Sequence, residues 1–299
     1  MGLLDDKVVA VTGAGQGLGF EEALEIGRQG AAVVINEYDP VTGERAIAEL
    51  TSQGISAALV VGDVSAEDTA KAIVAEAISE FGRLDALVNN AGTLRDRTLI
   101  KMTAEEWDTV VRVHLRGHFL TTREAASHWK SIGQPGHLVH TTSTAGLLGN
   151  FGQANYGAAK AGIAAFSTIA AFELAKFNIN SNAISPAART QMTLGAYGDV
   201  SSAADGRFDF WNPANVAPLV AVLCSDEAAH ISGKVFGVQG DSVEIYQPWT
   251  SAAFIQNGDE RWDPRVLASR MDELLEAGGV APEITNPMRR IRFSMTQRA

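Results

Sequence analysis

Three side chains near the middle of the chain, Ser143, Tyr156 and Lys160, are of types that together could move a proton to or from an alcohol. Residues 137–142 form a short β-rich run, so Ser143 is expected at the exit of a buried strand. The apolar residues that follow Tyr156 predict a long helix. The four-residue spacing of Tyr156 and Lys160 puts both side chains on one face of that helix, about 6 Å apart.

This spacing has a chemical use because a phenol, with a reference pKa of about 10, is a poor base near neutral pH. A fixed ammonium favours the phenolate, and bringing the phenol pKa to about 8 requires about 2.7 kcal/mol, at about 1.4 kcal/mol per unit. Ser143 would then hydrogen-bond the reacting oxygen while Tyr156 takes or returns its proton, and the carbon would exchange hydride with a cofactor. An ordinary helix that carries one Tyr and one Lys is the alternative.

The composition limits the classes of partner. A chain of 299 residues that is 46% hydrophobic can bury a large core. No linker-like stretch precedes about residue 245, so we expect one domain over 1–245 and a C-terminal extension over 246–299 that packs on the active site or on a neighbouring subunit. The net charge of -11 argues against nucleic acid or an anionic membrane as a partner. Cys224 is expected to be a buried apolar residue, and no Cys/His set has metal-ligand spacing, so no metal is predicted.

The chain also shows no export signal at its N-terminus and no apolar run of about 18 residues, the length that a membrane span requires. A soluble cytoplasmic protein is therefore expected.

The first element of the chain has the pattern of a dinucleotide site. An apolar strand over residues 7–12 leads directly into a glycine-rich turn and then a helix. Glycines let the backbone approach a pyrophosphate, whose charge is met by the N–H groups at the helix N-terminus. The residues predicted to bind the dinucleotide here are Gly13, Gln16, Gly17, Leu18 and Gly19.

An acidic residue follows the second predicted strand, residues 31–35. Glu37 stands 18 residues beyond Gly19. An acidic side chain there can accept hydrogen bonds from both hydroxyls of the adenosine ribose, while its charge repels a 2′-phosphate. NAD is therefore predicted in preference to NADP, and a surface glutamate without this role is the alternative.

Two further turns are predicted to contact the same dinucleotide. Asp63 could accept a hydrogen bond from the adenine amine, and Val64 could cover the adenine ring. After the fourth strand, the small and amide side chains of Asn90, Ala91 and Gly92 leave room for a cofactor. The alternation of strands and helices before residue 92 specifies a parallel, doubly wound sheet with its ligand at the carboxyl ends of the strands.

Four signatures in this order resemble the short-chain dehydrogenase/reductase family over roughly residues 5–240. They are Thr12-Gly13-x-x-x-Gly17-x-Gly19, Asn89-Asn90-Ala91-Gly92, Ser143, and Tyr156-x-x-x-Lys160. The resemblance implies an α/β, Rossmann-like fold with seven parallel strands and helices on both faces. It also implies hydride transfer between a small-molecule substrate and a nicotinamide cofactor, and a homodimer or homotetramer built through the long helices.

The resemblance assigns further cofactor contacts. Lys160 would also bond the nicotinamide ribose. The stretch after the sixth strand, from Pro186 to Thr190, is similar to a family loop in which a threonine bonds the nicotinamide carboxamide. Thr190 is therefore predicted to make this contact, with a simple helix N-cap as the alternative.

His114 stands where most members of the family have an asparagine whose backbone holds a water in a proton relay. Two interpretations stay open: the ring of His114 titrates in the relay, or the ring packs and only the backbone takes part. The stretch Val-His-Leu-Arg-Gly around His114 and residues 149–156 are similar to the (3R)-3-hydroxyacyl-CoA dehydrogenases of this family.

A 3-hydroxyacyl-CoA is therefore the predicted substrate. A hydroxysteroid or other bulky apolar alcohol is the nearest alternative, and a non-catalytic NAD-binding protein is an alternative of another class. Residues 193–214 have the composition of a flap over substrate. Phe208, Phe210 and Trp211 could line an apolar pocket, or they could pack against a partner subunit. The basic run Arg289–Arg292 could meet the phosphates of coenzyme A, or it could be a solvated tail.

Overall fold

The computed structural model describes residues 2–190, 208–247 and 249–281. The chain divides into two units, Met1–Tyr246 and Gln247–Ala299. Most of the predicted flap and the whole of the basic run Arg289–Arg292 lie outside the described residues. In the second unit, the described helices are α9 (Pro264–Ser269) and α10 (Met271–Ala277). The role predicted for this extension, packing on the active site or on a neighbouring subunit, stays a prediction.

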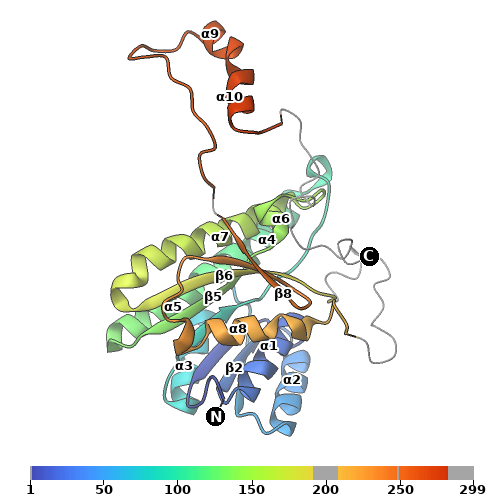
Figure 1. Cartoon of the computed structure of the whole chain (residues 1–299). Coiled ribbons are helices and arrows are strands. Elements are labelled where there is room, and N and C mark those ends of the chain that lie inside the picture. Colours follow the sequence, from blue (N-terminus) through green and yellow to red (C-terminus); the bar gives the residue numbers. More distant parts are fainter. Residues whose placement is uncertain (1, 191–207, 248, 282–299) are drawn as a thin grey trace. The chain divides into compact units, whose positions relative to one another are not determined.

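The first unit is built around one twisted sheet with the strand order β3-β2-β1-β4-β5-β6-β7-β8 (Figure 1). The first seven strands pair in parallel. Their order reverses between β1 and β4, which makes this a doubly wound sheet with a switch point beside β1. The strands are β1 (Val8–Thr12), β2 (Ala32–Glu37), β3 (Ala57–Val61), β4 (Ala86–Asn89), β5 (Gly136–Thr141), β6 (Ile179–Ala187), β7 (Val235–Gln239) and β8 (Ser242–Tyr246).

The predicted α/β, Rossmann-like architecture is confirmed, but the count of seven strands is one short. β8 pairs antiparallel with β7 and forms the edge of an eight-stranded sheet. The two strands are joined at Gly240, whose φ of 54° is a left-handed conformation that favours glycine. This makes a hairpin in which Gln239 pairs with Ser242. The strand after this turn was not predicted from the sequence.

Helices cover both faces of the sheet, as predicted (Figure 1). One layer contains α1, α2 and α8, and the other contains α3, α4, α5 and α7. The helices are α1 (Gly17–Arg28), α2 (Pro40–Ser52), α3 (Glu67–Phe81), α4 (Ala104–Val111), the π-helix η2 (Arg112–Arg116), α5 (Gly117–Ile132), α6 (Thr144–Leu147), α7 (Ala154–Leu174) and α8 (Ala217–Leu223). Short 3₁₀ turns are η1 (Leu99–Lys101), η3 (Ala175–Phe177), η4 (Pro213–Asn215) and η5 (Asp226–Ala228).

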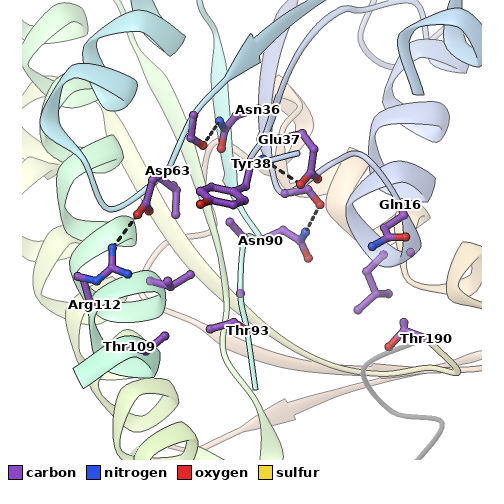
Figure 2. Close-up of a pocket in the computed structure, with 18 of the residues that line it drawn as sticks. Gln16, Asn36, Glu37, Tyr38, Asp63, Asn90, Thr93, Thr109, Arg112 and Thr190 are labelled. Atoms are coloured by element: carbon purple, nitrogen blue, oxygen red, sulfur yellow. Dashed lines mark hydrogen bonds and ion pairs between the residues drawn. The ribbon is translucent and has the colours of Figure 1, made fainter. Parts of the chain in front are cut away.

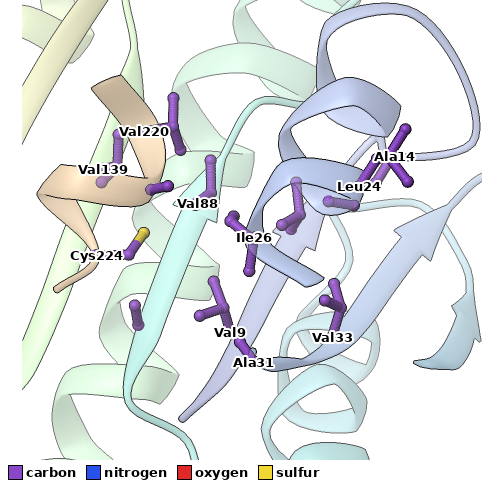
Figure 3. Packing of buried hydrophobic residues seen from close by; sticks show 14 of the residues in the cluster. Val9, Ala14, Leu24, Ile26, Ala31, Val33, Val88, Val139, Val220 and Cys224 are labelled. Atoms are coloured by element: carbon purple, nitrogen blue, oxygen red, sulfur yellow. The ribbon is translucent and has the colours of Figure 1, made fainter. Parts of the chain in front are cut away.

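The sheet has one buried apolar cluster on each face. On the side of α1 and α8, Ile26 and Val220 point toward the sheet residues Val88 and Val139 (Figure 3). Cys224 is fully buried in the same cluster, as predicted, and burial raises the pKa of its thiol above the ordinary value. The strands are apolar on both faces because helices cover both.

The helix that carries Tyr156 and Lys160 is also long and apolar. Among the described residues, Ala154–Phe177 is the one stretch long and apolar enough to cross a membrane. In the structure it packs on β5, β6 and α6. Helices inside the core of a globular domain have the same composition.

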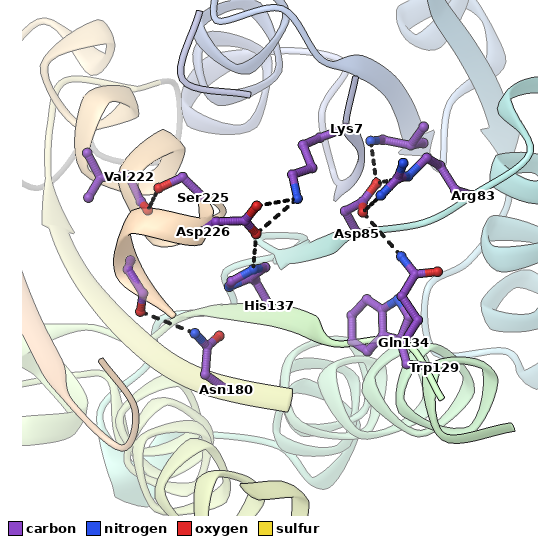
Figure 4. Close-up of polar contacts among 12 residues, drawn as sticks. Lys7, Arg83, Asp85, Trp129, Gln134, His137, Asn180, Val222, Ser225 and Asp226 are labelled. Carbon is purple, nitrogen blue, oxygen red and sulfur yellow. Dashed lines mark hydrogen bonds and ion pairs between the residues drawn. The ribbon is translucent and has the colours of Figure 1, made fainter. Parts of the chain in front are cut away.

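At the amino ends of the strands, charged side chains tie several elements together (Figure 4). Asp85, which is buried just before β4, accepts hydrogen bonds from the backbone N–H of Val8 at 2.9 Å and from the guanidinium of Arg83 at 2.6 and 2.8 Å. Lys7 donates to both oxygens of Asp226 at 2.8 and 2.9 Å. These contacts lie at the edge opposite the predicted site, so they stabilise the scaffold.

Candidate active site

A cavity of about 510 Å³ opens at the carboxyl ends of β1, β2, β3 and β4, where the strand order reverses (Figure 2). Eleven of the predicted binding residues line it: Gly13, Gln16, Gly17, Leu18, Glu37, Asp63, Val64, Asn90, Ala91, Gly92 and Thr190. The predicted residues that do not line it are Gly19, His114, Ser143, Tyr156, Lys160 and Pro186.

The glycine turn is fixed to the loop after β4. Gly13 has a φ of 63°, and a Cβ there would lie 2.7 Å from the Cα of Ala91. Asn90 donates from its side chain to the carbonyls of Thr12 and Gly13, both at 3.1 Å. The hydroxyl of Thr12 accepts from the backbone N–H groups of Asn90 and Ala91. These contacts fix the glycine turn against the loop after β4. They leave no room there for a residue larger than glycine at position 13.

The turn ends at the N-terminus of α1, which faces the cavity. Gln16 is the N-cap residue, and its side chain does not cap the helix. The N–H groups of the first helical turn and the positive end of the helix dipole are therefore available to an anionic group. Gly19 lies behind this surface, where a Cβ would be 2.5 Å from the side-chain nitrogen of Asn90. Gly19 thus allows close packing and does not itself line the cavity.

Glu37, the last residue of β2, contacts the glycine turn through its side chain. One carboxylate oxygen accepts from the backbone N–H of Gly15 at 3.0 Å, and the other accepts from Tyr38 at 2.8 Å and Asp39 at 3.3 Å. A Cβ on Gly15 would lie 2.6 Å from the carboxylate. Because each carboxylate oxygen has two lone pairs, Glu37 keeps acceptor capacity toward the cavity. The cradle therefore fits a ribose diol beside a diphosphate.

Asp63 is held in place by Ser65 and Arg112, and Figure 2 shows its contact with Arg112. It accepts from the backbone and hydroxyl of Ser65 at 2.9 and 2.6 Å, and from Arg112 on η2 at 2.6 Å. Burial acts to raise the pKa of Asp63, but the hydrogen bonds from Ser65 and the ion pair with Arg112 outweigh it and lower the pKa. Val64 is buried next to Gly117, where a Cβ would come within 2.9 Å of it.

Lys160 and Tyr156 lie together at the start of α7. The ammonium nitrogen of Lys160 is 5.5 Å from the centre of the Tyr156 ring. It donates to the backbone carbonyl of Thr141, the last residue of β5, at 2.5 Å. Lys160 is almost completely buried, and burial lowers its pKa to about 7, against the field of the carboxyl group of Glu22.

Ser143 stands at the exit of β5, as the sequence indicates, and is the N-cap residue of α6. Its hydroxyl accepts a hydrogen bond from the backbone N–H of Ala145 at 3.2 Å. A hydroxyl has one proton to donate and two lone pairs, so Ser143 can still donate to a substrate oxygen. Because α6 packs against α7, Ser143 and Tyr156 come from neighbouring elements.

His114 lies on the π-helix η2 and packs edge-on against the Tyr156 ring, with 5.2 Å between ring centres. Its Nε2 is 2.8 Å from the carbonyl oxygen and 3.0 Å from the nitrogen of Thr93. Burial and the charge of Lys160 lower the pKa of His114 to about 3. A Cβ on Gly92 would lie 2.2 Å from the ring, so Gly92 provides the space for this histidine.

Thr190 lines the cavity next to Gly17, where a Cβ would lie 3.9 Å from Thr190. Pro186 lies within β6 and pairs with Val238. Beyond the flap residues that the structure does not describe, Phe210 packs closely on Gly240 and edge-on against Trp211. Phe208 is largely exposed. An apolar pocket lined by these aromatic residues stays a prediction.

Sequence reasoning missed several residues that line the cavity: Asn36, Tyr38, Gly62, Thr93, Arg95, Thr109, Arg112 and Val113. Arg112 and Thr109 belong to the region of α4 and η2, which lies far from the glycine turn in sequence. Their position depends on how that region packs beside β4, and no local motif marks it. Within the described ranges, no group of three or more His, Cys, Asp or Glu side chains is placed to hold a metal ion.

The family to which the chain belongs follows from a direct comparison. The model of the short chain dehydrogenase family matches residues 7–196. A crystal structure of a short chain dehydrogenase from Mycobacterium avium superposes with a TM-score of 0.85 at 37% identity, and covers 95% of this chain and 98% of that one.

Relatives with named activities are also similar. Hydroxyacyl-CoA dehydrogenase ChsB1 of Mycobacterium tuberculosis is 41% identical over 90% of this chain and 88% of that protein. The mouse peroxisomal multifunctional enzyme type 2 is 38% identical over 91% of this chain and 37% of its own length. The yeast peroxisomal hydratase-dehydrogenase-epimerase is 41% identical over 87% of this chain and 27% of its own length. This chain belongs to the short-chain dehydrogenase family and is an oxidoreductase that acts on CH–OH groups.

Proposed function

We propose that this enzyme oxidises a 3-hydroxyacyl-CoA to the 3-ketoacyl-CoA with NAD, using Ser143, Tyr156 and Lys160. The observation that carries the proposal is the contact of the buried Lys160 ammonium with the Tyr156 ring at 5.5 Å. Similarity to a hydroxyacyl-CoA dehydrogenase over nearly the whole chain supports the substrate class.

Each of the three residues has a defined task. Ser143 donates a hydrogen bond to the substrate oxygen and fixes its position. Tyr156 takes the hydroxyl proton, and the charge of Lys160 favours the phenolate that can do so. A nicotinamide held in the cavity would supply the acceptor for the hydride of the carbinol carbon. Lys160, whose ammonium donates to the carbonyl of Thr141, would also bond the nicotinamide ribose.

The proposed cofactor residues form a continuous cradle. The N-terminus of α1 would meet the pyrophosphate. Glu37 would bond the adenosine ribose, and its negative charge disfavours a 2′-phosphate, which supports NAD as the cofactor. Asp63 would accept from the adenine amine, with Val64 and Tyr38 on either side of the ring. Thr190 would bond the nicotinamide carboxamide.

His114 is proposed to take part through its backbone. A ring with a pKa of about 3 stays neutral throughout the physiological range. His114 lies on the π-helix η2, a feature that is frequent at functional sites, and its backbone carbonyl would hold the water of the relay. Replacing His114 by Asn should therefore leave the shape of the pH–rate profile unchanged. If the variant lost or shifted one limb of the pH–rate profile, the interpretation in which the ring of His114 titrates would hold instead.

The test of the proposed function is a substrate panel with purified enzyme. We expect NADH formation from (3R)-3-hydroxyacyl-CoA thioesters, and much weaker reduction of NADP. Turnover of hydroxysteroids without any turnover of thioesters would replace the acyl-CoA proposal by the steroid alternative. Equal use of NAD and NADP would remove the proposed role of Glu37.

We also propose a homodimer or homotetramer built through the long helices, and a cytoplasmic location. The observation in favour of assembly is a set of exposed apolar side chains on α5 and α7: Phe119, Ile132, Ile169 and Phe172. Such side chains are commonly covered by another copy of the chain. Light scattering that gives the mass of a single chain at micromolar concentration would contradict the assembly.

A further inference from the structure

Thr190 forms one wall of the cavity shortly after the end of β6 (Figure 2). It faces Gly17, the first residue of α1, where a Cβ would lie 3.9 Å from the Thr190 side chain. The next residue that the structure describes after Thr190 is Phe208. The contacts between residues 188–190 and the chain that follows Phe208 therefore bear on how this wall is held.

Arg189, the neighbour of Thr190, is bound to the returning chain through both its backbone and its side chain. Its backbone N–H donates to the carbonyl of Trp211 at 2.7 Å. Its guanidinium donates to both carboxylate oxygens of Asp209, to one of them at 3.3 Å. Two-point pairing of a planar guanidinium with a carboxylate fixes the orientation of both groups. These contacts tie the residue before Thr190 to residues 209–211.

Asp209 is itself anchored by the short helix that follows it. Its carboxylate accepts from the backbone N–H of Trp211 at 3.2 Å, and its backbone carbonyl accepts from the side chain of Asn215 at 2.8 Å. Asn215 belongs to η4, which packs against α1. Asp209 is therefore connected through η4 to the same helix whose first residue faces Thr190.

The ion pair of Arg189 and Asp209 joins two segments that are seated in the fold. Ala188 is buried in the apolar cluster on the side of α1 and α8. Phe210 packs on the turn between β7 and β8, where a Cβ on Gly240 would lie 2.2 Å from its ring.

The surroundings of the pair favour its persistence near neutral pH. The side chains of Arg189 and Asp209 are 21% and 19% exposed, so water and salt screen the pair less than they would screen a fully exposed one. The hydrogen bond from Arg189 lowers the pKa of Asp209, so the carboxylate is ionised at neutral pH.

We propose that the ion pair of Arg189 and Asp209 positions Thr190 at the nicotinamide end of the cavity, so that both residues set the affinity for the nicotinamide half of the cofactor without touching it. The inference rests on the part of the proposed function in which Thr190 bonds the nicotinamide carboxamide. The adenosine and pyrophosphate are assigned to Glu37, Asp63 and the N-terminus of α1. A change at Asp209 should therefore act on one end of the cofactor only.

Isothermal titration calorimetry with NAD and with ADP-ribose, which lacks the nicotinamide, separates the two ends. Asp209→Asn removes the charge of the side chain and keeps its size. The affinity of this variant for NAD should fall about fivefold, while its affinity for ADP-ribose should stay within about twofold of wild type. Retained binding of ADP-ribose also shows that the variant is folded. Asp209→Glu keeps a carboxylate and should recover part of the affinity for NAD.

A double variant tests whether the ion pair acts through Thr190. Thr190→Val removes the hydroxyl with little change of shape and should show the same selective loss of affinity for NAD. If Asp209 acts through this hydroxyl, the double variant of Thr190→Val and Asp209→Asn should bind NAD within about twofold of Thr190→Val alone. Losses that multiply would overturn the inference, because independent sites add their free energies.

An arginine–carboxylate pair outside the cavity provides the matched control. Glu124 on α5 pairs with Arg123 at 2.8 Å, and Glu124→Gln should leave both affinities unchanged. Equal losses of affinity for NAD and ADP-ribose in Asp209→Asn, or no loss of either, would overturn the inference. Failure of the proposed function is distinguishable, because a wild-type protein that binds neither ligand would refute the cofactor site itself, and the inference with it.

Discussion

Arg112 shows how a single residue can serve the site without belonging to a recognisable motif. Its guanidinium donates to Asp63 at 2.6 Å and to the hydroxyl of Ser65 at 2.5 Å. Asp63 is the residue proposed to accept a hydrogen bond from the adenine amine. Arg112 therefore fixes the orientation of the carboxylate that recognises the base, and links this part of the cavity to the π-helix that carries His114.

Replacing Arg112 by Gln should weaken the binding of NAD while leaving the chemistry nearly unchanged. The ion pair is partly exposed and worth about 1 kcal/mol, which corresponds to about a fivefold rise in the KM for NAD. The value of kcat should stay within about twofold of wild type, because Arg112 does not touch the reacting atoms. Steady-state kinetics with varied NAD measures both constants. A large fall in kcat with an unchanged KM would contradict this assignment.

The residues proposed for catalysis could be predicted from the sequence because their signal is local. Tyr156 and Lys160 are one helical turn apart, and Ser143 follows a strand directly. Arg112 has no such signal, because it meets Asp63 only through the packing of η2 beside the turn after β3.

The elements were predictable where their local patterns agree with the tertiary fold. The strand, glycine turn and helix at residues 8–28 appear as the sequence indicates. The π-helix η2 was not expected, since residues 104–132 have continuous helical periodicity. Its wider turn depends on packing beside Gly92 and Tyr156, which no local rule supplies. β8 was missed because a five-residue edge strand with exposed Val243 and Ile245 gives only a short alternating pattern.

At the element scale, Asp85 joins the starts of β1 and β4 (Figure 4). Asp85→Ala should lower the free energy of unfolding by about 1–3 kcal/mol, because it leaves the buried N–H of Val8 without an acceptor. Urea denaturation measures the change. Asp226→Asn is the control, since Asp226 is largely exposed and its pair with Lys7 should contribute less than about 1 kcal/mol. Equal losses in the two variants would show that burial of Asp85 is not the cause.

At the scale of the whole molecule, the sheet explains why distant motifs form one site. Parallel strands end at the same edge, so the turns after β1, β2, β3 and β4 surround one cavity, and β5 delivers Ser143 to the same edge. The alternation of strands and helices predicts this arrangement from sequence alone. What it does not predict is the substrate, because the alternation of strands and helices places the catalytic residues and the turns around the cavity but carries no signal for the groups that contact a substrate.

The most direct test of the proposed role of Tyr156 is the turnover of Tyr156→Phe with NAD and a (3R)-3-hydroxyacyl-CoA. Loss of the proton acceptor should lower kcat by about 10²- to 10⁴-fold, while NAD still binds with an affinity within about twofold of wild type. Tyr246→Phe, on the edge strand β8, is the matched control and should turn over at the wild-type rate. Wild-type turnover by Tyr156→Phe would contradict the proposal that this phenol, beside Lys160, carries the proton.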